Sequence, residues 1–442
     1  MDEYLIANGT VVTLGDNDEI IDDGAVYVKN GSIEDVGKTA ELKEKYDCPV
    51  KVDATDQVVM PGFICAHHHL YSTMARGFTP PGEPAYTFEE ILERLWWKLD
   101  CVLTEEAVEY SAYIPLIECI RNGTTTFLDH HASPSCVDGS LDILADAVEQ
   151  AGLRANLSYE VSDRNESGQG VEENRRFLDS LSSRDSEFID GMVGIHASLT
   201  VSDDTLARCR EVAEEFDVGY HLHVAEGVED HQDALENYGM RTVERLVEND
   251  ICGDDTLYIH CVNVNEKEIE LIRDTGTMVV HNPESNMNNA VGVAPVLEML
   301  EEGITVGLGT DGMASDMPSQ MRVAHLLHQL DKSDPRVAFV EAPELLIQNN
   351  VEIANRLFPV ELGKIEPGAA ADFAILDYSA PTELSDDTFL GHLIYGLVDA
   401  TVDTTIVNGN ILMENKEVKV FDVPEVAKEC REIAGDLWQR IS

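Results

Sequence analysis

Three consecutive histidines, His67, His68 and His69, follow an apolar run early in the chain. The run at residues 58–64 is rich in β-branched and aromatic side chains, which predicts a buried strand. Because side chains alternate along a strand, His67 and His69 point to one face and His68 points to the other. Two imidazoles on one face of a strand end can chelate a single metal ion. A chance histidine cluster is the alternative, so the interpretation depends on the remainder of the chain.

Further apolar segments along the chain also end in polar residues that can do chemistry. The strand candidates are residues 125–130, 154–161, 192–197, 218–225, 257–262, 277–283 and 305–311. The polar residues at or just beyond their ends are His130, His131, His196, His221, His223, Glu226, His260, His281 and Asp311. In a barrel of parallel strands the active site collects at the carboxyl ends of the strands. Such a set of polar residues at one rim indicates a catalytic centre rather than core packing.

Amphipathic segments separate these strands and predict the helices that position them. They cover residues 105–121, 140–151, 203–215, 239–248 and 266–274. With the strand before His67, the alternation gives eight βα units, which predicts an α/β fold with a closed (β/α)8 TIM barrel. An open doubly wound sheet is the alternative, but no G-x-G-x-x-G motif follows a first strand.

Both ends of the chain predict a second, smaller domain. Short alternating strands with Asn-Gly turns occupy residues 1–60, and a block with the same pattern returns late in the chain. We expect the two blocks to complete one small β-sandwich domain. The expected domains are residues 1–60 (first part of the sandwich), 61–362 (the catalytic barrel), 363–420 (second part of the sandwich) and 421–442 (a C-terminal helix).

The composition excludes several classes of partner. The chain has 84 acidic and 30 basic residues, a net charge of −54, which repels nucleic acid and anionic membranes. Because self-repulsion of this size is costly in dilute buffer, we predict a halophilic protein from an acidic proteome, in a salt-rich cytoplasm. An unusually acidic mesophilic protein is the alternative. No apolar run approaches the ~18 residues of a membrane span, and the N-terminus lacks the basic start of a signal peptide, so we expect a cytoplasmic protein.

The types of the polar residues indicate a catalytic metal centre. Neutral imidazole and carboxylate oxygen are suitable ligands for Zn²⁺ or Fe²⁺, and a catalytic ion keeps one position open for water. We expect His67, His69, Asp311 and one histidine of the 221–223 segment to bind the metal. Strand alternation places both histidines of that segment on one face and leaves the choice open. Glu226 follows just beyond the strand and suits general acid/base work.

The motifs resemble the amidohydrolase superfamily, in its cytosine deaminase, triazine hydrolase and adenosylhomocysteine deaminase branch. The segments that carry the resemblance are 61–69 (PGFICAHHH), 221–226 (HLHVAE), 259–262 (IHCV), 281–286 (HNPESN), 309–312 (GTDG) and 363–372 (GKIEPGAAAD). They span nearly the whole chain. Residues 95–100, 129–135 and 285–289 are further similar to the SsnA aminohydrolase group of this branch. The fold that the resemblance implies is a TIM barrel of the metal-dependent hydrolase type.

The resemblance also implies roles for single residues. It implies that His223 is the metal ligand of its pair, that Glu226 shuttles protons and that His260 orients the attacking water or polarises the substrate. Asp311 is expected to act in catalysis as well as in metal binding. The expected substrate-binding residues are His131, with His130 as its alternative, and His196, His281, Asn286 and Trp97. Two departures from relatives, Ser-Leu at residues 198–199 and the missing asparagine pair at 312–317, leave the substrate open.

One absence separates the reaction classes within the superfamily. Members that open cyclic amides commonly bridge two metals with a carboxylated lysine on strand 4, but this chain has no lysine between Lys98 and Lys267. One divalent metal is therefore expected, with zinc as first choice and iron or manganese as alternatives. Mononuclear members typically add water to a C=N carbon of a heterocycle and expel ammonia.

The expected function is that of a metal-dependent aminohydrolase, a hydrolase of non-peptide carbon–nitrogen bonds. The expected substrate is a small amino-substituted heterocycle such as a purine or pyrimidine. Same-fold alternatives are a chlorohydrolase and a hydrolase that opens a cyclic amidine ring. The non-enzyme alternative is an assembly subunit with the same barrel. The resemblance further implies a homo-oligomer, a dimer or larger.

Overall fold

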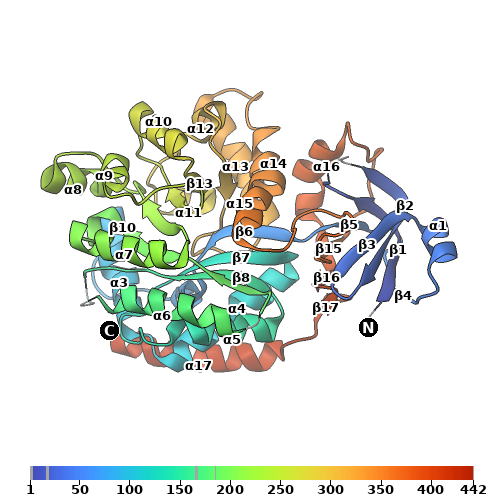
Figure 1. Cartoon of the computed structure of the whole chain (residues 1–442), viewed down its shortest axis with the longest axis horizontal. Helices are drawn as coiled ribbons and strands as arrows, with labels where there is room; N and C mark the ends of the chain where they lie inside the picture. Colours follow the sequence, from blue (N-terminus) through green and yellow to red (C-terminus); the bar gives the residue numbers. More distant parts are fainter. Residues whose placement is uncertain (1–2, 16–18, 165–167, 185, 442) are drawn as a thin grey trace.

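The computed structural model describes residues 3–15, 19–164, 168–184 and 186–441. Figure 1 shows two parts side by side. The smaller part is a sheet formed by strands from both ends of the chain, in blue and red. The larger part is an α/β unit formed by the middle of the chain.

The larger part is a closed barrel of parallel strands. Its strands are β6 (Phe63–His68), β7 (Thr124–His131), β8 (Arg154–Tyr159), β10 (Val193–Ala197), β11 (Tyr220–Val224), β12 (Leu257–His260), β13 (Met278–His281) and β14 (Val306–Leu308). They form two ladders, one from β6 to β9 (Ile189–Gly191) and one from β10 to β14. Parallel bridges between Val161 and Ile195 and between His68 and Asp311 join the ladders at both seams. This is the predicted (β/α)8 barrel, and its strands are buried on both faces, which explains their continuous apolar sequences.

A side chain from outside the strands ties the last barrel strand to the first. Asn350 begins α15 (Asn350–Leu357) and is fully buried. Its Nδ2 donates to the carbonyl oxygens of Ile64 (2.7 Å) and Leu308 (2.9 Å), and its Oδ1 accepts from Leu308 N (2.7 Å). The amide therefore supplies hydrogen bonds between β6 and β14 below the seam at His68.

The helices begin and end where local sequence signals place them. Thr104 caps α4 (Glu105–Arg121) by accepting from Ala107 N, and Gly152 ends α5 (Ser140–Ala151) with a φ of 73°. The other barrel helices are α6 (Gln169–Arg184), α7 (Asp203–Phe216), α8 (Val228–Tyr238), α9 (Thr242–Glu248), α10 (Glu266–Thr275), α11 (Pro283–Asn288), α12 (Val296–Glu301), α13 (Met317–Lys332) and α14 (Glu341–Glu344). None of the helices in the described ranges is long and apolar enough to cross a bilayer.

Both chain ends meet in the separate sheet, as predicted. Its strands are β1 (Glu3–Val12), β2 (Ile20–Lys29), β3 (Ser32–Lys38), β4 (Val50–Asp53), β5 (Val58–Pro61), β15 (Phe373–Asp377), β16 (Thr401–Val407), β17 (Asn410–Glu414) and β18 (Glu417–Val418). Hydrogen bonds join these nine strands in one mixed sheet, in which β15 pairs antiparallel with β5. The short helices α1 (Thr39–Lys45) and α16 (Phe389–Tyr395) accompany the sheet. The domain limits given above stay a prediction.

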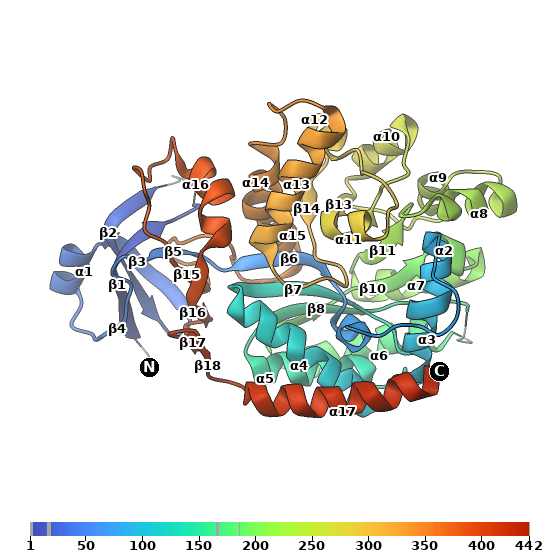
Figure 2. The same ribbon diagram turned by 180° about the vertical axis from the view of Figure 1, so that it is seen from behind.

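The last helix leaves the sheet and returns to the barrel. Helix α17 (Val423–Ile441) runs alongside α4, as Figure 2 shows from behind. Near its end Trp438 donates from Nε1 to the carbonyl oxygen of Met74 (2.7 Å), and its ring lies 5.3 Å from that of Phe78. Helix α17 therefore supports the segment that follows the histidine triplet.

Candidate active site

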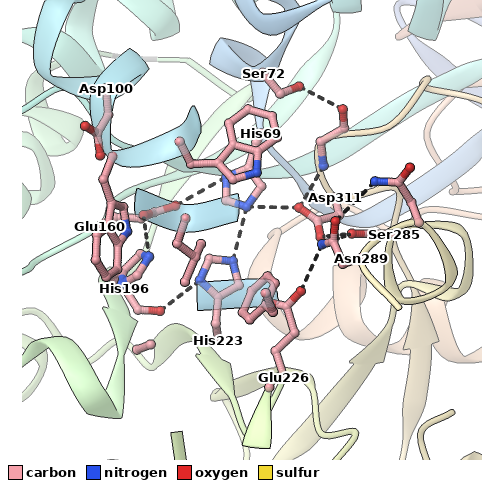
Figure 3. Close-up of a pocket in the computed structure, with 18 of the residues that line it drawn as sticks. His69, Ser72, Asp100, Glu160, His196, His223, Glu226, Ser285, Asn289 and Asp311 are labelled. Atoms are coloured by element: carbon pink, nitrogen blue, oxygen red, sulfur yellow. Dashed lines mark hydrogen bonds and ion pairs between the residues drawn. The ribbon is translucent and has the colours of Figure 1, made fainter. Parts of the chain in front are cut away.

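A pocket opens at the carboxyl ends of the barrel strands. Figure 3 shows its polar wall, in which side chains from strand ends far apart in the sequence point toward one another. The segment between β6 and α4, with α2 (Phe88–Ile91) and α3 (Trp97–Leu99), forms the opposite wall. The lining residues that bear on the chemistry are His69, Trp97, Asp100, Glu160, His196, His223, Glu226, Ser285, Asn289 and Asp311.

Four of the predicted metal-ligand atoms converge on one point of this pocket. His69 Nε2 lies 3.1 Å from His223 Nε2 and 3.2 Å from Asp311 Oδ1. His67 Nε2 lies 3.8 Å from the same carboxylate oxygen. Ligand atoms at about 2.1 Å around a tetrahedral zinc ion are about 3.4 Å from one another, so these separations fit such an ion. Groups drawn from these residues are also among the described clusters able to hold a metal.

The hydrogen bonds of two histidines show that the facing nitrogens carry no proton. His69 Nδ1 lies 2.6 Å from the carbonyl oxygen of His130, and His223 Nδ1 lies 2.8 Å from that of His196. A carbonyl only accepts, so each Nδ1 carries the hydrogen of a neutral ring and each Nε2 is a bare lone pair. Two lone pairs 3.1 Å apart repel each other unless a cation lies between them. This is the usual way in which proteins orient metal-binding histidines.

His221 lies next to His67 and not at the point of convergence. Its Nε2 is 2.8 Å from His67 Nδ1, and its Nδ1 is 3.4 Å from Ser158 Oγ. His67 Nε2 is buried and has no hydrogen-bond partner among the described residues, so its lone pair is available to a metal ion. Burial and the neighbouring histidines lower the pKa of His67 and His223 well below the ordinary value, which keeps both rings neutral. The arrangement supports His223 as the ligand and His221 as the residue that orients His67.

The backbone turns sharply where three of the strands deliver their functional side chains. Ala225, His260 and Asp311 have φ values of 50°, 73° and 55°, in the left-handed region that non-glycine residues rarely occupy. Asp311 is held there from both sides of the seam, because its N–H donates to the carbonyl oxygen of His67 (3.1 Å) and its carbonyl oxygen accepts from His69 N (3.3 Å). The strained turn and the His-x-His pair are therefore fixed relative to each other.

A second group of atoms beside the metal point is suited to moving protons. Glu226 Oε2 lies 3.4 Å from His260 Nε2, and its Oε1 accepts from Asn289 Nδ2 (3.2 Å). His260 Nδ1 donates to Asn286 Oδ1 (2.7 Å), and within the described part of the chain its Nε2 has no hydrogen-bond partner and lies 3.6 Å from Asp311 Oδ2. Burial and then the Asp311 carboxylate raise the pKa of Glu226 well above its ordinary value. Glu226 therefore holds a proton readily and can return it.

Two predicted substrate-binding residues point away from the pocket. Val280 packs in the barrel interior, so the next residue of β13, His281, points outward and its ring lies 5.1 Å from that of His328 on α13. The same alternation on β7 turns His131 outward, where its Nε2 bonds to Ser133 Oγ (2.9 Å). The structure thus corrects the choice between His130 and His131 as the inward residue. His130 faces inward and stacks on His221 at 4.5 Å.

The other predicted substrate residues divide into two groups. His196 and Trp97 line the pocket, with ring centres 6.5 Å apart. Asn286 is fully buried and does not reach the pocket wall, because its side chain is bonded to His260. Its observed position is that of a residue that orients His260.

Sequence reasoning missed two buried carboxylates of the pocket. Glu160 directly follows β8, the one barrel strand to which no polar end residue had been assigned. Its place at the carboxyl end of a barrel strand is the same signal that identified the other candidate residues. Asp100 begins a short 3₁₀ helix (Asp100–Val102) directly after α3, where no strand end or periodicity marks a functional position. Both residues line the pocket and are almost fully buried.

The sequence profile of the Amidohydrolase family matches residues 58–412. The chain belongs to the amidohydrolase family. The 5'-deoxyadenosine deaminase of Methanosarcina mazei is 34% identical over 449 aligned residues, covering 100% of both chains. The 5-methylthioadenosine/S-adenosylhomocysteine deaminase of Syntrophomonas wolfei is 33% identical over 443 residues, covering 98% of this chain and 99% of the relative.

Solved structures agree with this assignment. An adenosine deaminase from Xanthomonas campestris with bound zinc has a TM-score of 0.85 at 25% identity and covers 98% of each chain. An atrazine chlorohydrolase from Arthrobacter aurescens TC1 complexed with zinc has a TM-score of 0.81 at 23% identity, with 98% of this chain and 100% of that chain covered, and shows the shared fold.

These relatives confirm several predictions made from the sequence. The amidohydrolase branch and the α/β barrel fold are confirmed. Deaminase relatives along the whole chain confirm a metal-dependent aminohydrolase that acts on non-peptide carbon–nitrogen bonds. The histidine-rich cluster provides a metal site of the kind that this activity needs.

Proposed function

We propose that this aminohydrolase deaminates an adenosine-type nucleoside. Water adds to the amino-bearing carbon of the purine ring and ammonia leaves, so that the C–NH₂ group becomes a carbonyl and the adjacent ring nitrogen gains a hydrogen. The observation that carries the proposal is the bare Nε2 pair of His69 and His223 beside Asp311 and the Glu226 carboxylate. Relatives named as deaminases of adenosine derivatives support the substrate class.

The residues of the chain divide the work between metal binding and proton transfer. His67, His69, His223 and Asp311 would hold one divalent ion, which supplies an acidified water as nucleophile near neutral pH. Glu226 takes a proton from that water, gives it to the ring nitrogen next to the reacting carbon and later passes a proton to the leaving amine.

Neighbouring side chains fix the two carboxylates in their roles. Ser285 Oγ donates to Asp311 Oδ2 (2.6 Å), which leaves Oδ1 directed at the histidines. Asn289 holds Glu226 Oε1, so Oε2 faces His260. His260, whose Nδ1 donates to Asn286 Oδ1, presents its Nε2 lone pair and is placed to accept a hydrogen bond from the attacking water and so orient it. Trp97 and His196 are proposed to contact the substrate.

The chlorohydrolase and the non-catalytic subunit are less well supported as functions of this chain. The chlorohydrolase shares the fold at 23% identity, whereas the deaminases share at least 33% over the full chain. A non-catalytic subunit has no need of an intact ligand set with an adjacent proton-transfer pair. Deamination is therefore the activity that site and relatives favour together.

The proposal also covers the identity of the metal, the cellular location, the oligomeric state and the excluded partners. We propose zinc as the metal, because structures with the same fold hold zinc. We also propose a cytoplasmic, salt-adapted homo-oligomer that binds neither nucleic acid nor anionic membranes. The net charge of −54 supports the salt adaptation and the repulsion of polyanions.

Product analysis tests the proposal. Metal-loaded protein in high salt is incubated with adenosine, 5'-deoxyadenosine, 5'-methylthioadenosine, cytosine and atrazine, and ammonia, chloride and ring-opened products are measured. We expect ammonia in equal amount to a 6-oxo purine nucleoside, released about 10²–10⁴-fold more slowly by the Glu226→Gln variant. Chloride release or ring opening without ammonia would overturn the proposal.

A further inference from the structure

Large apolar side chains are exposed together at one place on the surface, outside the pocket. Ten such side chains are exposed among the described residues, and five of them lie on or beside helices α13, α14 and α16: Leu326, Leu330, Phe339, Val340 and Tyr395. We call these five the apolar patch. They are 37–78% exposed, and none of them is among the described residues that line the pocket. Figure 1 shows the three helices next to one another where the two parts of the molecule meet.

Contacts within the fold make the apolar patch continuous. Leu326 and Leu330 lie one turn apart on the outer face of α13. The chain after α13 folds back along that helix, because His325 Nδ1 donates to a carbonyl oxygen of this segment (2.9 Å). The ring of Phe339 consequently lies 6.3 Å from that of His325 and 6.5 Å from that of Tyr395 on α16. The barrel and the helix beside the sheet therefore contribute to one surface.

The surroundings of the apolar patch are nearly neutral, unlike the chain as a whole. Residues 317–344 contain three basic and four acidic residues, whereas the whole chain contains 30 and 84. The sequence of α16 contains no lysine, arginine, aspartate or glutamate. Two copies of a chain with a net charge of −54 repel each other. At this nearly neutral surface they can approach at little electrostatic cost.

The rim of the apolar patch carries both signs of charge at both ends of α13. Toward the start of the helix Arg322 pairs with Asp399 (2.6 Å), and beyond its end Arg336 pairs with Asp334 (2.6 Å). A second copy related by a twofold axis presents the same pairs in reverse order, so basic groups can meet acidic groups at both ends. Docking on an anionic membrane needs an excess of basic residues instead, which residues 317–344 do not have.

The size of the apolar patch also fits an interface between proteins. Five side chains with these exposures present on the order of 500 Å² of mostly apolar surface, which is near the upper limit for an ordinary monomer. With its charged rim the patch approaches the ~800 Å² that each partner buries in a stable complex. Its two aromatic residues, Phe339 and Tyr395, are of the types enriched at the centre of interfaces.

We propose that the apolar patch is the face on which a second copy of this chain docks, with the two copies related by a twofold axis through the patch. Salt controls the strength of this contact. At about 1 M salt the charge of each copy is screened within about 3 Å, so the apolar contact dominates. At about 0.1 M salt the repulsion between the copies extends over about 10 Å and opposes the contact. The dimer therefore forms in high salt and weakens in low salt.

Substitutions at Leu330 test the interface, because this side chain is the most exposed of the patch, at 78%, and lies outside the core. Leu330→Glu and Leu330→Lys are prepared as full chains, and far-UV CD checks that they fold. Leu235→Glu and Leu235→Lys are the matched controls, on α8 at a side chain 46% exposed outside the patch. Molar mass is measured by light scattering after gel filtration, and dissociation constants by sedimentation equilibrium, at about 1 M and about 0.1 M potassium chloride.

We expect wild type to have twice the mass of one chain at the higher salt concentration and a weaker dimer at the lower one. Each Leu330 variant alone should dissociate about 100-fold or more easily, because one interface then holds two like charges. An equimolar mixture of Leu330→Glu and Leu330→Lys should regain about tenfold or more in dimer affinity, since one interface then holds opposite charges. The Leu235 variants should behave as wild type.

Three results would overturn the inference. The first is a wild type that keeps the mass of one chain in high salt at every concentration the protein tolerates. The second is a folded Leu330→Glu variant that associates as strongly as wild type, because the interface then lies elsewhere. The third is a mixture of the two Leu330 variants that is no more associated than either alone, because the patch of one copy then does not face the patch of the other.

Discussion

His69 and His223 point their Nε2 atoms at each other across 3.1 Å, and neither nitrogen carries a proton. The two residues come from strands on opposite sides of the barrel, and each is oriented by a backbone carbonyl. Such a contact is unfavourable in a metal-free protein and favourable once a cation lies between the lone pairs. The relationship therefore marks the place where the reaction is centred.

Alanine substitutions at the two histidines of β11 should show which of them is the metal ligand. His223→Ala removes a nitrogen from the point of convergence and should leave little metal after dialysis, as measured by elemental analysis. His221→Ala removes only the partner of His67 Nδ1, so metal affinity should fall about 10–100-fold and recover with excess zinc. If His221→Ala loses its metal while His223→Ala keeps it, the two roles are reversed.

Glu226→Gln should stop turnover without releasing the metal. The amide keeps the shape of the side chain but cannot take a proton, so kcat should fall about 10²–10⁴-fold at unchanged metal content. Glu417→Gln, an exposed change of equal charge, is the matched control. Turnover within a few-fold of wild type in the Glu226 variant would remove Glu226 from the proton-transfer role.

Asp190 should make stability depend on pH. Burial raises its pKa from 3.8 to about 6, although Gly191 N donates to its Oδ1 (2.8 Å). Below about pH 4 the carboxyl is protonated in both the folded and unfolded states and has no effect, whereas above about pH 6 the folded state carries the full penalty of an ionised buried group.

Asp190→Asn should remove that penalty and keep the Oδ1 acceptor. The free energy of unfolding of the variant relative to wild type should be near zero at pH 4, rise between pH 4 and pH 6, and level off at about 1–3 kcal/mol above that range. Thermal unfolding of both proteins across this pH range measures this difference in the free energy of unfolding. Asp138→Asn, at a side chain 99% exposed, is the control. A gain that is the same at pH 4 and pH 8 would contradict the assignment.

Low salt should destabilise the fold. A net charge of −54 repels itself over about 10 Å at 0.1 M salt and over about 3 Å at 1 M. The unfolding temperature followed by far-UV CD should therefore rise most steeply below about 0.5 M potassium chloride, where screening changes fastest. Sucrose at matched osmolality should not reproduce that steep part. A melting temperature that is flat over this range speaks against salt adaptation.

Much of the architecture could be predicted from the sequence because burial and capping leave local signals. The predicted helices at 105–121 and 140–151 have the observed limits of α4 and α5, since Thr104 and Gly152 mark their ends. The barrel strands are buried on both faces, so their continuous apolar runs located them to within a few residues. The shared direction of His67 and His69 could be predicted because side chains two residues apart on a strand point to the same face.

The sequence could not predict how deep a side chain lies in the barrel or whether it faces the interior. His221 and His223 share a strand face, and only the barrel shows that one lies beneath the other. His281 needed the knowledge that Val280 occupies the interior of the barrel. Asp100 reaches the pocket from the 3₁₀ helix after α3, whose placement over the barrel depends on tertiary packing. Local patterns carry no information about such positions.

The most direct test of the account is a metal titration of chelator-stripped protein in high salt, with ammonia release from 5'-deoxyadenosine measured at each addition of zinc. The convergent ligand set predicts no activity without metal, a linear rise, and a plateau at one equivalent per chain. Full ammonia release from the stripped protein would contradict the metal-centred account, and so would a plateau at two equivalents.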